Sequence, residues 1–286
     1  MFRSVLTATD FSHGGSRAVE VAAAWAEAQN ATLDILNVVP PLITAAMPAT
    51  EFLDDLHASI RSDAEGKMDA LVRSLPPKLR ATGHVSVGFA HREILAHGKQ
   101  LKSDLIVVGT AGEGSVSRAV LGSVADRLVR TSETAILLVP ENARAALPRV
   151  IVAPTDLTPS SVHAVQRVLD LALELSATVE VVHSFEIPLF VGRDSPLVRD
   201  LAATLREGVR GLHDLGSRAN LHVMEGSPAR CILAVQESSH ADLIMMAASG
   251  RGLVSSLLLG GVTDRVVRTA PVAVLVLKEP HGHPHP

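Results

Sequence analysis

Residues 109–123 read GTAGEGSVSRAVLGS, and the chain on either side of this stretch predicts the fold. The apolar run DLIVV at residues 104–108 comes just before it and is typical of a buried parallel strand. The pattern VADRLVR at residues 124–130 comes just after it and predicts a helix. The stretch therefore connects a strand to the helix that follows.

Four glycines gather in this connection, and Ser123 directly follows the last of them. Glycine permits positive φ and a close approach of the backbone, so such a run can turn its amides toward an anion. Ser123 begins the expected helix, with Asp126 three residues later at the spacing of a capping box, and a helix start favours a phosphate. Phosphate binding is one interpretation, and a flexible loop before a well-capped helix is the other.

Two named phosphate motifs are excluded. A P-loop requires a lysine directly after the second glycine of GxxxxG, whereas Ser115 follows Gly114 here. The dinucleotide fingerprint GxGxxG lacks its third glycine, and it would be expected after the first strand of the fold. The glycine-rich stretch therefore belongs to neither class.

Composition narrows the class of protein. The chain has 286 residues, 47% of them hydrophobic, which suits one large domain or two of average size. Only 2% are aromatic and the net charge is -4, so neither a basic face nor a stacking platform for a nucleic acid is expected. No apolar run approaches the roughly 18 residues of a membrane span. The single cysteine, Cys231, and an opening segment without a signal-peptide pattern lead us to expect a cytoplasmic protein.

The chain repeats itself. The segment RVIVAPTDLTP at residues 149–159 repeats the first strand and its helix cap, so Asp156 corresponds to Asp10. Likewise, DLIMMA from residue 242 repeats DLIVVG from residue 104. We predict domains at residues 1–140 and 149–278, a linker at 141–148, and a tail rich in His and Pro at 279–286.

Strands alternate with helices in both halves, which is typical of a parallel sheet. In the first half we expect strands at residues 2–8, 33–39, 84–89, 105–108 and 135–139, and further helices at 14–30, 51–74 and 92–102. The predicted fold class is α/β, with two tandem doubly wound domains, each a five-stranded parallel sheet with helices on both faces. The ligand crevice of such a sheet lies where the winding reverses, so Asp10 should meet the glycine-rich stretch there.

These motifs together resemble the universal stress protein family in its tandem, two-domain form. Nucleotide-binding members of that family carry G-x-x-G, nine residues, and then G-S or G-T, and the glycine-rich stretch satisfies every position. The family's aspartate after the first strand corresponds to Asp10 in the setting ATDFS, and its glycine before the third helix corresponds to Gly88 and Gly226. The resemblance implies ATP binding in the first half, with or without Mg²⁺, and a nucleotide-dependent regulator of stress responses.

The residue chemistry agrees with this assignment. The glycines would let the backbone approach the phosphates, and Ser123 would add a hydroxyl. Asp10 cannot lie against a phosphate without a metal, because like charges repel, so it would bind ribose hydroxyls or help to hold Mg²⁺. Val38 would either line the adenine site or be ordinary strand core. The predicted nucleotide-binding residues are Ala8, Thr9, Asp10, Val38, Gly109, Thr110, Gly112, Gly114, Ser115, Gly122, Ser123 and Val124.

The second half departs from the pattern. Ala247 stands in place of the first glycine, and Gly260-Gly261 replaces the glycine-serine pair. If the first position requires positive φ, alanine there costs about 1–2 kcal/mol. We therefore expect weaker or absent ATP binding in this half, or another ligand. The weaker candidate residues are Thr155, Asp156, Gly250, Arg251, Gly252 and Gly260.

Two other functions stay open. A slow ATPase is one, although we identify no P-loop lysine, general base or water-positioning residue. A structural interaction module is the other, because apolar fifth strands could pair the halves about a pseudo-twofold axis, as the resemblance also implies, and two chains could associate further. Neither a nucleic acid nor a membrane is expected as a partner.

No protein-held metal site is expected, because the histidines show no trusted ligand spacing. The tail is different, because the histidines at 281, 283 and 285 stand at alternate positions. They could take up Zn²⁺ or Ni²⁺ weakly, or they could simply be solvated.

Overall fold

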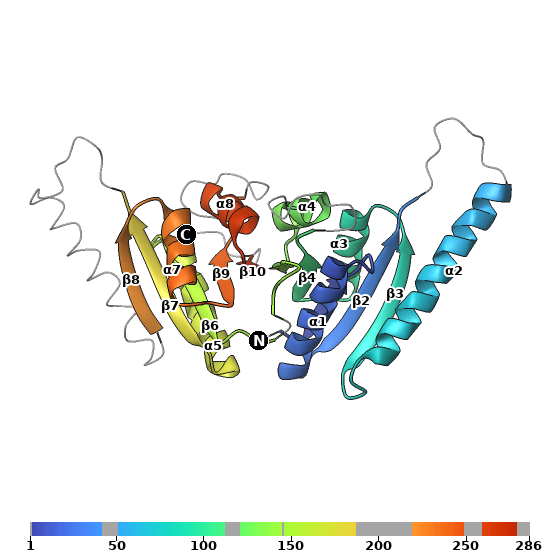
Figure 1. The fold of residues 1–286 in the computed structure, drawn as a ribbon, viewed down its shortest axis with the longest axis horizontal. Coiled ribbons are helices and arrows are strands. Elements are labelled where there is room, and N and C mark those ends of the chain that lie inside the picture. Colours follow the sequence, from blue (N-terminus) through green and yellow to red (C-terminus); the bar gives the residue numbers. More distant parts are fainter. Residues whose placement is uncertain are drawn as a thin grey trace, which may run out of the picture. The chain divides into compact units, whose positions relative to one another are not determined.

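The computed structural model describes residues 2–41, 51–111, 121–144, 146–186, 219–248 and 259–278. The chain divides into two compact units, Met1–Ala146 and Leu147–Pro286. The division falls within the stretch expected to be a linker. Each unit contains five strands with helices packed against them (Figure 1).

Unit 1 winds outward from a central strand. Its elements are β1 (Ser4–Ala8), α1 (His13–Ala28), β2 (Thr32–Val39), α2 (Glu51–Ser74), β3 (Arg80–Val87), α3 (Ala90–Gln100), β4 (Leu105–Gly109), α4 (Ser123–Thr131) and β5 (Ala135–Val139). The strands lie in the order β3-β2-β1-β4-β5, and each neighbouring pair is parallel. The chain builds β1, β2 and β3 in one direction and then returns to place β4 on the other side of β1. The winding therefore reverses between β1 and β4, as the sequence predicted.

Unit 2 has the same topology. Its elements are β6 (Val150–Pro154), α5 (Pro159–Leu175), β7 (Thr178–Phe185), β8 (Ala219–Glu225), α7 (Pro228–Ser238), β9 (Leu243–Ala247), α8 (Gly261–Thr269) and β10 (Ala273–Leu277). The strands lie in the order β8-β7-β6-β9-β10, again all parallel. The doubly wound α/β class is confirmed for both halves.

The same tertiary hydrogen bonds recur in the two units. Asp104, just before β4, accepts bonds from the amides of Arg3 and Ser4, and Asp242, just before β9, accepts one from the amide of Arg149. These carboxylates accept hydrogen bonds from amides at the start of the central strand. This structural role explains why an Asp precedes the fourth strand in both halves.

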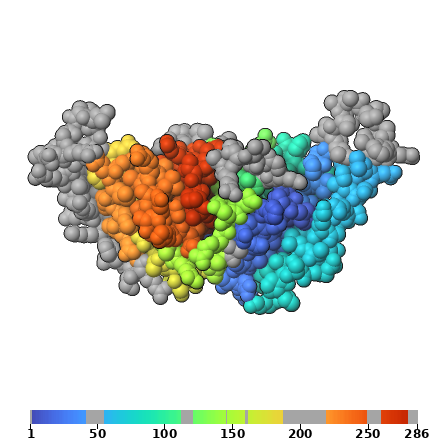
Figure 2. All heavy atoms as spheres, viewed as in Figure 1, coloured from blue at the N-terminus to red at the C-terminus, as the bar shows by residue number. Residues whose placement is uncertain are grey.

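Helices cover both faces of the unit 1 sheet. A Cβ added at Gly83 of β3 would meet the side chain of Met68 in α2, whereas the ring of the next residue, His84, lies 6.0 Å from that of His97 in α3. Because successive strand residues point to opposite faces, α2 and α3 lie on opposite faces. On the face of unit 1 that α2 covers, its light-blue residues form much of the visible surface (Figure 2).

Among the described residues, the core of unit 1 is aliphatic apart from one aromatic pair. Strands β4 and β5 are buried at almost every position, as expected for strands covered on both faces. The ring centroids of Phe2 and Trp25 lie 6.0 Å apart, and both side chains are only 2% exposed. This pair closes the end of the core between α1 and the start of the chain.

The expected element types are correct, but several boundaries differ. The third strand begins at Arg80 rather than at residue 84, because residues 80–83, although poorly patterned, pair in register with β2. The first strand begins at Ser4 rather than at residue 2, and α3 begins at Ala90 rather than at residue 92. Within the described residues, no helix is long and apolar enough to cross a membrane.

Two leucines of α5 give a matched test of the unit 2 core. Leu171 is fully buried, whereas Leu173 is 71% exposed. We expect Leu171→Ala to lower the free energy of unfolding by about 2–5 kcal/mol through lost burial and a residual cavity. Leu173→Ala should change it by less than about 0.5 kcal/mol. Urea titration followed by far-UV circular dichroism would test this, and equal shifts would contradict the packing of α5.

Candidate functional site

A cavity of about 500 Å³ lies in unit 1 where the winding reverses. The ends of β1, β2 and β4 form its floor, and the starts of α3 and α4 form its sides. Nine of the residues expected at a nucleotide site line it: Ala8, Thr9, Asp10, Val38, Gly109, Thr110, Gly122, Ser123 and Val124. Gly112, Gly114 and Ser115 lie outside the described residues. The structure thus brings together every member of the predicted set that it describes.

Asp10 is held in place by the turn that leads into α1. Its Oδ1 accepts hydrogen bonds from the amide of Ser12 at 3.0 Å and from the Ser12 hydroxyl at 2.5 Å. Ser12 in turn caps α1 by accepting from the amide of Gly15. Phe11 adopts a left-handed φ of 62°, a conformation that costs about 1 kcal/mol in a non-glycine residue. The exposed carboxylate is therefore fixed at the edge of the cavity.

A buried amide joins β1 to β2 at the same edge. The side chain of Asn37 donates from Nδ2 to the carbonyl oxygen of Thr9 at 2.8 Å, and the amide of Thr9 donates to the carbonyl oxygen of Leu36. Thr9 itself is only 6% exposed. These bonds fix the backbone on which Asp10 stands relative to Val38 on the neighbouring strand.

The connection between β4 and α4 is closed at its ends. The amide of Gly122 donates to the carbonyl oxygen of Thr110 at 2.7 Å. A Cβ added at Gly109 would lie 2.9 Å from the carbonyl oxygen of Gly14, in the first turn of α1. Glycine at 109 therefore permits a close approach of β4 to α1.

One expectation about this connection is wrong, and one condition considered for it is not met. Gly122 rather than Ser123 is the N-cap of α4 and has no side chain to cap the helix, and Asp126 pairs with Arg130, so the expected capping box of Ser123 and Asp126 does not form. Gly109 does not have a positive φ, because among the described glycines only Gly226 does. Steric contact, and not a left-handed backbone, explains the glycine at 109.

The uncapped start of α4 matters for binding. The first amides of a helix lack partners within the helix and carry a partial positive charge. Ser123 is exposed and, together with Val124 and Ala125, lines the cavity. Because these residues line the cavity, an oxyanion bound there could accept hydrogen bonds from amides at the helix start.

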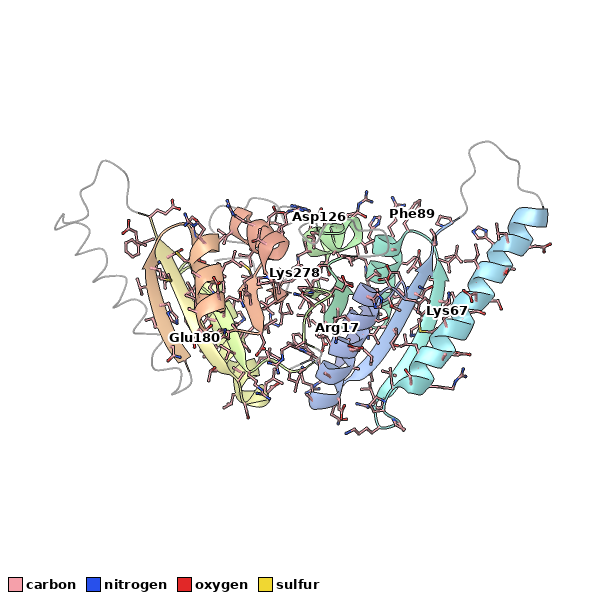
Figure 3. All side chains as sticks on the ribbon, viewed as in Figure 1. Arg17, Lys67, Phe89, Asp126, Glu180 and Lys278 are labelled. Atoms are coloured by element: carbon pink, nitrogen blue, oxygen red, sulfur yellow. The ribbon has the colours of Figure 1, made fainter. Side chains whose placement is uncertain are left out.

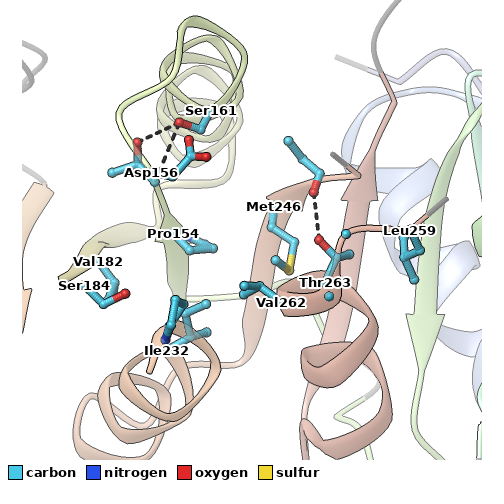
Figure 4. A pocket seen from close by; sticks show the side chains of 15 residues that line it. Pro154, Asp156, Ser161, Val182, Ser184, Ile232, Met246, Leu259, Val262 and Thr263 are labelled. Carbon is cyan, nitrogen blue, oxygen red and sulfur yellow. Dashed lines mark hydrogen bonds between the residues drawn. The ribbon is translucent and has the colours of Figure 1, made fainter. Parts of the chain in front are cut away.

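A second cavity of about 400 Å³ occupies the equivalent place in unit 2. Thr155, Asp156 and Gly260 line it, whereas Gly250, Arg251 and Gly252 lie outside the described residues. Its floor is more crowded, because Met246 takes the place of Val108 (Figure 4). Since the first glycine of the motif does not need positive φ, Ala247 carries no left-handed strain, and that expected cost is withdrawn.

The acidic corner of this second cavity is bonded differently. Ser161 stands where unit 1 has Gly15, and its Oγ lies 3.0 Å from the hydroxyl oxygen of Thr155 (Figure 4). The Ser161 Oγ also accepts from the amide of Asp156, while Thr158 donates to the Asp156 carboxylate at 2.6 Å, as Ser12 donates to Asp10 in unit 1. The Ser161 hydroxyl is thus the difference, because it occupies a position that is bare backbone in unit 1.

Several lining residues were missed in the sequence. These are Gly15, Leu36, Ala90, Ile94, Val108, Ala111 and Ala125. Most are small or aliphatic and read as ordinary core or helix residues. The one available signal was the four-residue spacing of Ala90 and Ile94 on one helical face.

Other candidate chemistry is weaker. Cys231 is buried, as expected, and burial raises the pKa of its thiol, so little thiolate forms at neutral pH. Among the described residues, no three His, Cys, Asp or Glu side chains are placed to hold a metal ion. The tail histidines lie outside these residues.

The fold and the two cavities define a tandem, doubly wound α/β protein with a cavity at the winding reversal of each half. The family profile of the universal stress proteins matches residues 1–140 and 148–278. The chain therefore belongs to the universal stress protein family, in its tandem form.

Individual relatives support this family assignment. A universal stress protein of Methanocaldococcus jannaschii is 32% identical over 139 residues, covering 46% of this chain and 82% of its own. One from Mycobacterium tuberculosis is 26% identical over 305 aligned positions, covering 96% of this chain and 95% of its own. The crystal structure of an Archaeoglobus fulgidus universal stress protein superposes with a TM-score of 0.73 at 18% identity, covering 96% of this chain and 98% of the other.

Replacing Gly109 tests the close approach at the cavity, and replacing Gly66 is the matched control at an open position. Gly109→Ala would place a Cβ against the Gly14 carbonyl, so we expect a loss of about 1–3 kcal/mol in stability. Gly66 lies within α2 with nothing within 4 Å of an added Cβ, so Gly66→Ala should add about 0.5–1 kcal/mol. Thermal unfolding by calorimetry would measure both, and a neutral Gly109→Ala would contradict the contact.

Proposed function

We propose that unit 1 binds ATP and that the protein is a cytoplasmic, nucleotide-dependent regulator in a stress response. The observation that carries the proposal is that Asp10 and the uncapped start of α4 line the same cavity. A volume of about 500 Å³ is in the range of pockets that hold ligands of this size.

Different parts of the cavity suit different parts of a nucleotide. The amides of Ser123 and Val124 suit phosphate oxygens. The Asp10 carboxylate suits ribose hydroxyls, and Mg²⁺ bound to the phosphates would remove the repulsion between the two acidic groups. Val38, Leu36 and Ile94 offer apolar contact for a base.

Binding stoichiometry tests the proposal. We expect isothermal titration calorimetry to show one ATP per chain, because unit 2 has lost the serine at the helix start and has a crowded floor. Asp10→Ala should weaken binding at least about tenfold through the loss of hydrogen bonds to a charged group. Asp156→Ala, the same change in unit 2, should leave the affinity unchanged.

The same titration has clear contrary outcomes. Two equal, tight sites per chain would refute the difference between the units, and no binding of ATP would refute the function. Far-UV circular dichroism of Asp10→Ala is needed as a control, because Asp10 also bonds to Ser12. AMP and cAMP belong in the series, since another universal stress protein forms a complex with cAMP in its crystal structure.

Slow hydrolysis of ATP is the second candidate function. Release of γ-phosphate that disappears in both Asp10→Ala and Gly122→Val would favour an ATPase, whereas tight binding without release favours the regulator. Pairing of the halves about a pseudo-twofold axis, and association of two chains, are further proposals from the family resemblance. Light scattering would measure the number of chains in solution.

A further inference from the structure

Three basic side chains converge at the start of α3 and α4 in unit 1. An Nη1 of Arg127 in α4 lies 3.4 Å from Nε2 of His91 in α3. The guanidinium of Arg92 stacks over the half-exposed ring of Phe89 at 5.4 Å from its centroid. We call His91, Arg92 and Arg127 the rim cluster. In Figure 3, Phe89 and Asp126 mark this edge of unit 1.

None of the three residues of the rim cluster lines the cavity itself, but two of them stand close to residues that do. His91 directly follows Ala90, which lines the cavity, and Arg127 stands one helical turn after Ser123, which also lines it. Side chains on a helix lean back over the preceding turn. Arg127 therefore leans toward the helix start whose amides face the cavity.

The arginines of the cluster have no ion-pair partner among the residues that the structure describes. In the part of the chain that the structure describes, no carboxylate forms an ion pair with Arg92 or Arg127, whereas Arg130 pairs with Asp126 one turn away. Partial burial lowers the pKa of His91, and repulsion from Arg127 and Arg92 lowers it further. Arginine can only donate, so Nε2 of His91 accepts from Arg127 as the neutral ring. An anion placed here would be attracted by both arginines.

Unit 2 reproduces the two arginines of the cluster but not its histidine. Helices α3 and α7 correspond, as do α4 and α8, so Ala229 takes the place of His91 and Arg265 that of Arg127. Ala229 is buried and Ser227 stands where unit 1 has Phe89. Both arginines are thus common to the two units, with Arg230 in the place of Arg92, but the histidine beside them is found only in unit 1.

From this placement we propose that Arg127 and His91 bind the outer phosphates of the nucleotide and so make unit 1 prefer nucleotides with more phosphates. The inference rests on the proposed nucleotide function and deepens it. The amides of α4 would hold the phosphate nearest the nucleoside, and the Arg127 guanidinium, which offers several donors, would reach the next. His91 adds a second donor at the same place when its ring takes up a proton.

The test compares adenosine, AMP and ATP by calorimetry at fixed salt, in the full chain and in single variants. We expect Arg127→Ala to weaken ATP binding about tenfold, the effect of one charge-assisted hydrogen bond at an exposed rim, and to leave adenosine binding unchanged. His91→Ala, which copies the residue of unit 2, should weaken ATP binding about threefold, because the donor that the protonated ring supplies beside the phosphate is lost. Arg265→Ala removes the same charge from unit 2 and should change nothing.

The outcomes separate the two proposals. If the unaltered chain binds none of the three ligands, the nucleotide function fails. If ATP binds but Arg127→Ala leaves its affinity intact, or weakens adenosine and ATP equally, the nucleotide function stands and the role of the rim cluster is refuted. A tenfold loss restricted to ATP supports it.

Discussion

The hydrogen bond from the Gly122 amide to the Thr110 carbonyl oxygen joins the end of β4 to the start of α4. It brings the first amides of α4 to the reversal point of the sheet. Nearby, the absence of a side chain at Gly109 lets the first turn of α1 approach the same strand through the Gly14 carbonyl, and Asp10 and Ser12 lie in the turn that leads into α1. The cavity, its carboxylate and its uncapped amides all take their positions from these two backbone contacts. In unit 2 the corresponding bond, from Gly260 to Ala248, is 3.3 Å long.

Much of this fold could be predicted from the sequence, because apolar strand runs and a repeated Asp after the first strand leave few arrangements open. The site could be predicted as far as it depended on glycines, an acidic residue and a helix start. The helix cap could not, since Ser123 followed by Asp126 has the spacing of a capping box, yet Gly122 takes the cap position and Asp126 turns to Arg130. Residues 80–83 were missed because only their pairing with β2 keeps them in a strand. The sequence of one segment does not show which strand it will pair with.

The two halves show how one fold can carry two different pockets. The framework bonds are retained: Asn37 bonds to the carbonyl of Thr9, and His183 bonds to that of Thr155, in the same place. The changes fall on the side chains that face the cavities, such as Gly15 and Ser161. Because the backbone positions are held by the framework, side chains at the pocket can change size and polarity at little cost to folding. Duplication thus allows one half to keep a chemistry while the other departs from it.

The packing of Trp25 against Phe2 has a practical consequence. Trp25 is the chain's single tryptophan, and it lies in α1, the helix whose first turn carries the cap beside Asp10. Intrinsic indole fluorescence is therefore an optical signal of the first half alone, while the second half is silent at the same wavelengths. One tube of unlabelled protein can report on a single repeat, and changes in the other repeat reach that signal only if the two are energetically coupled.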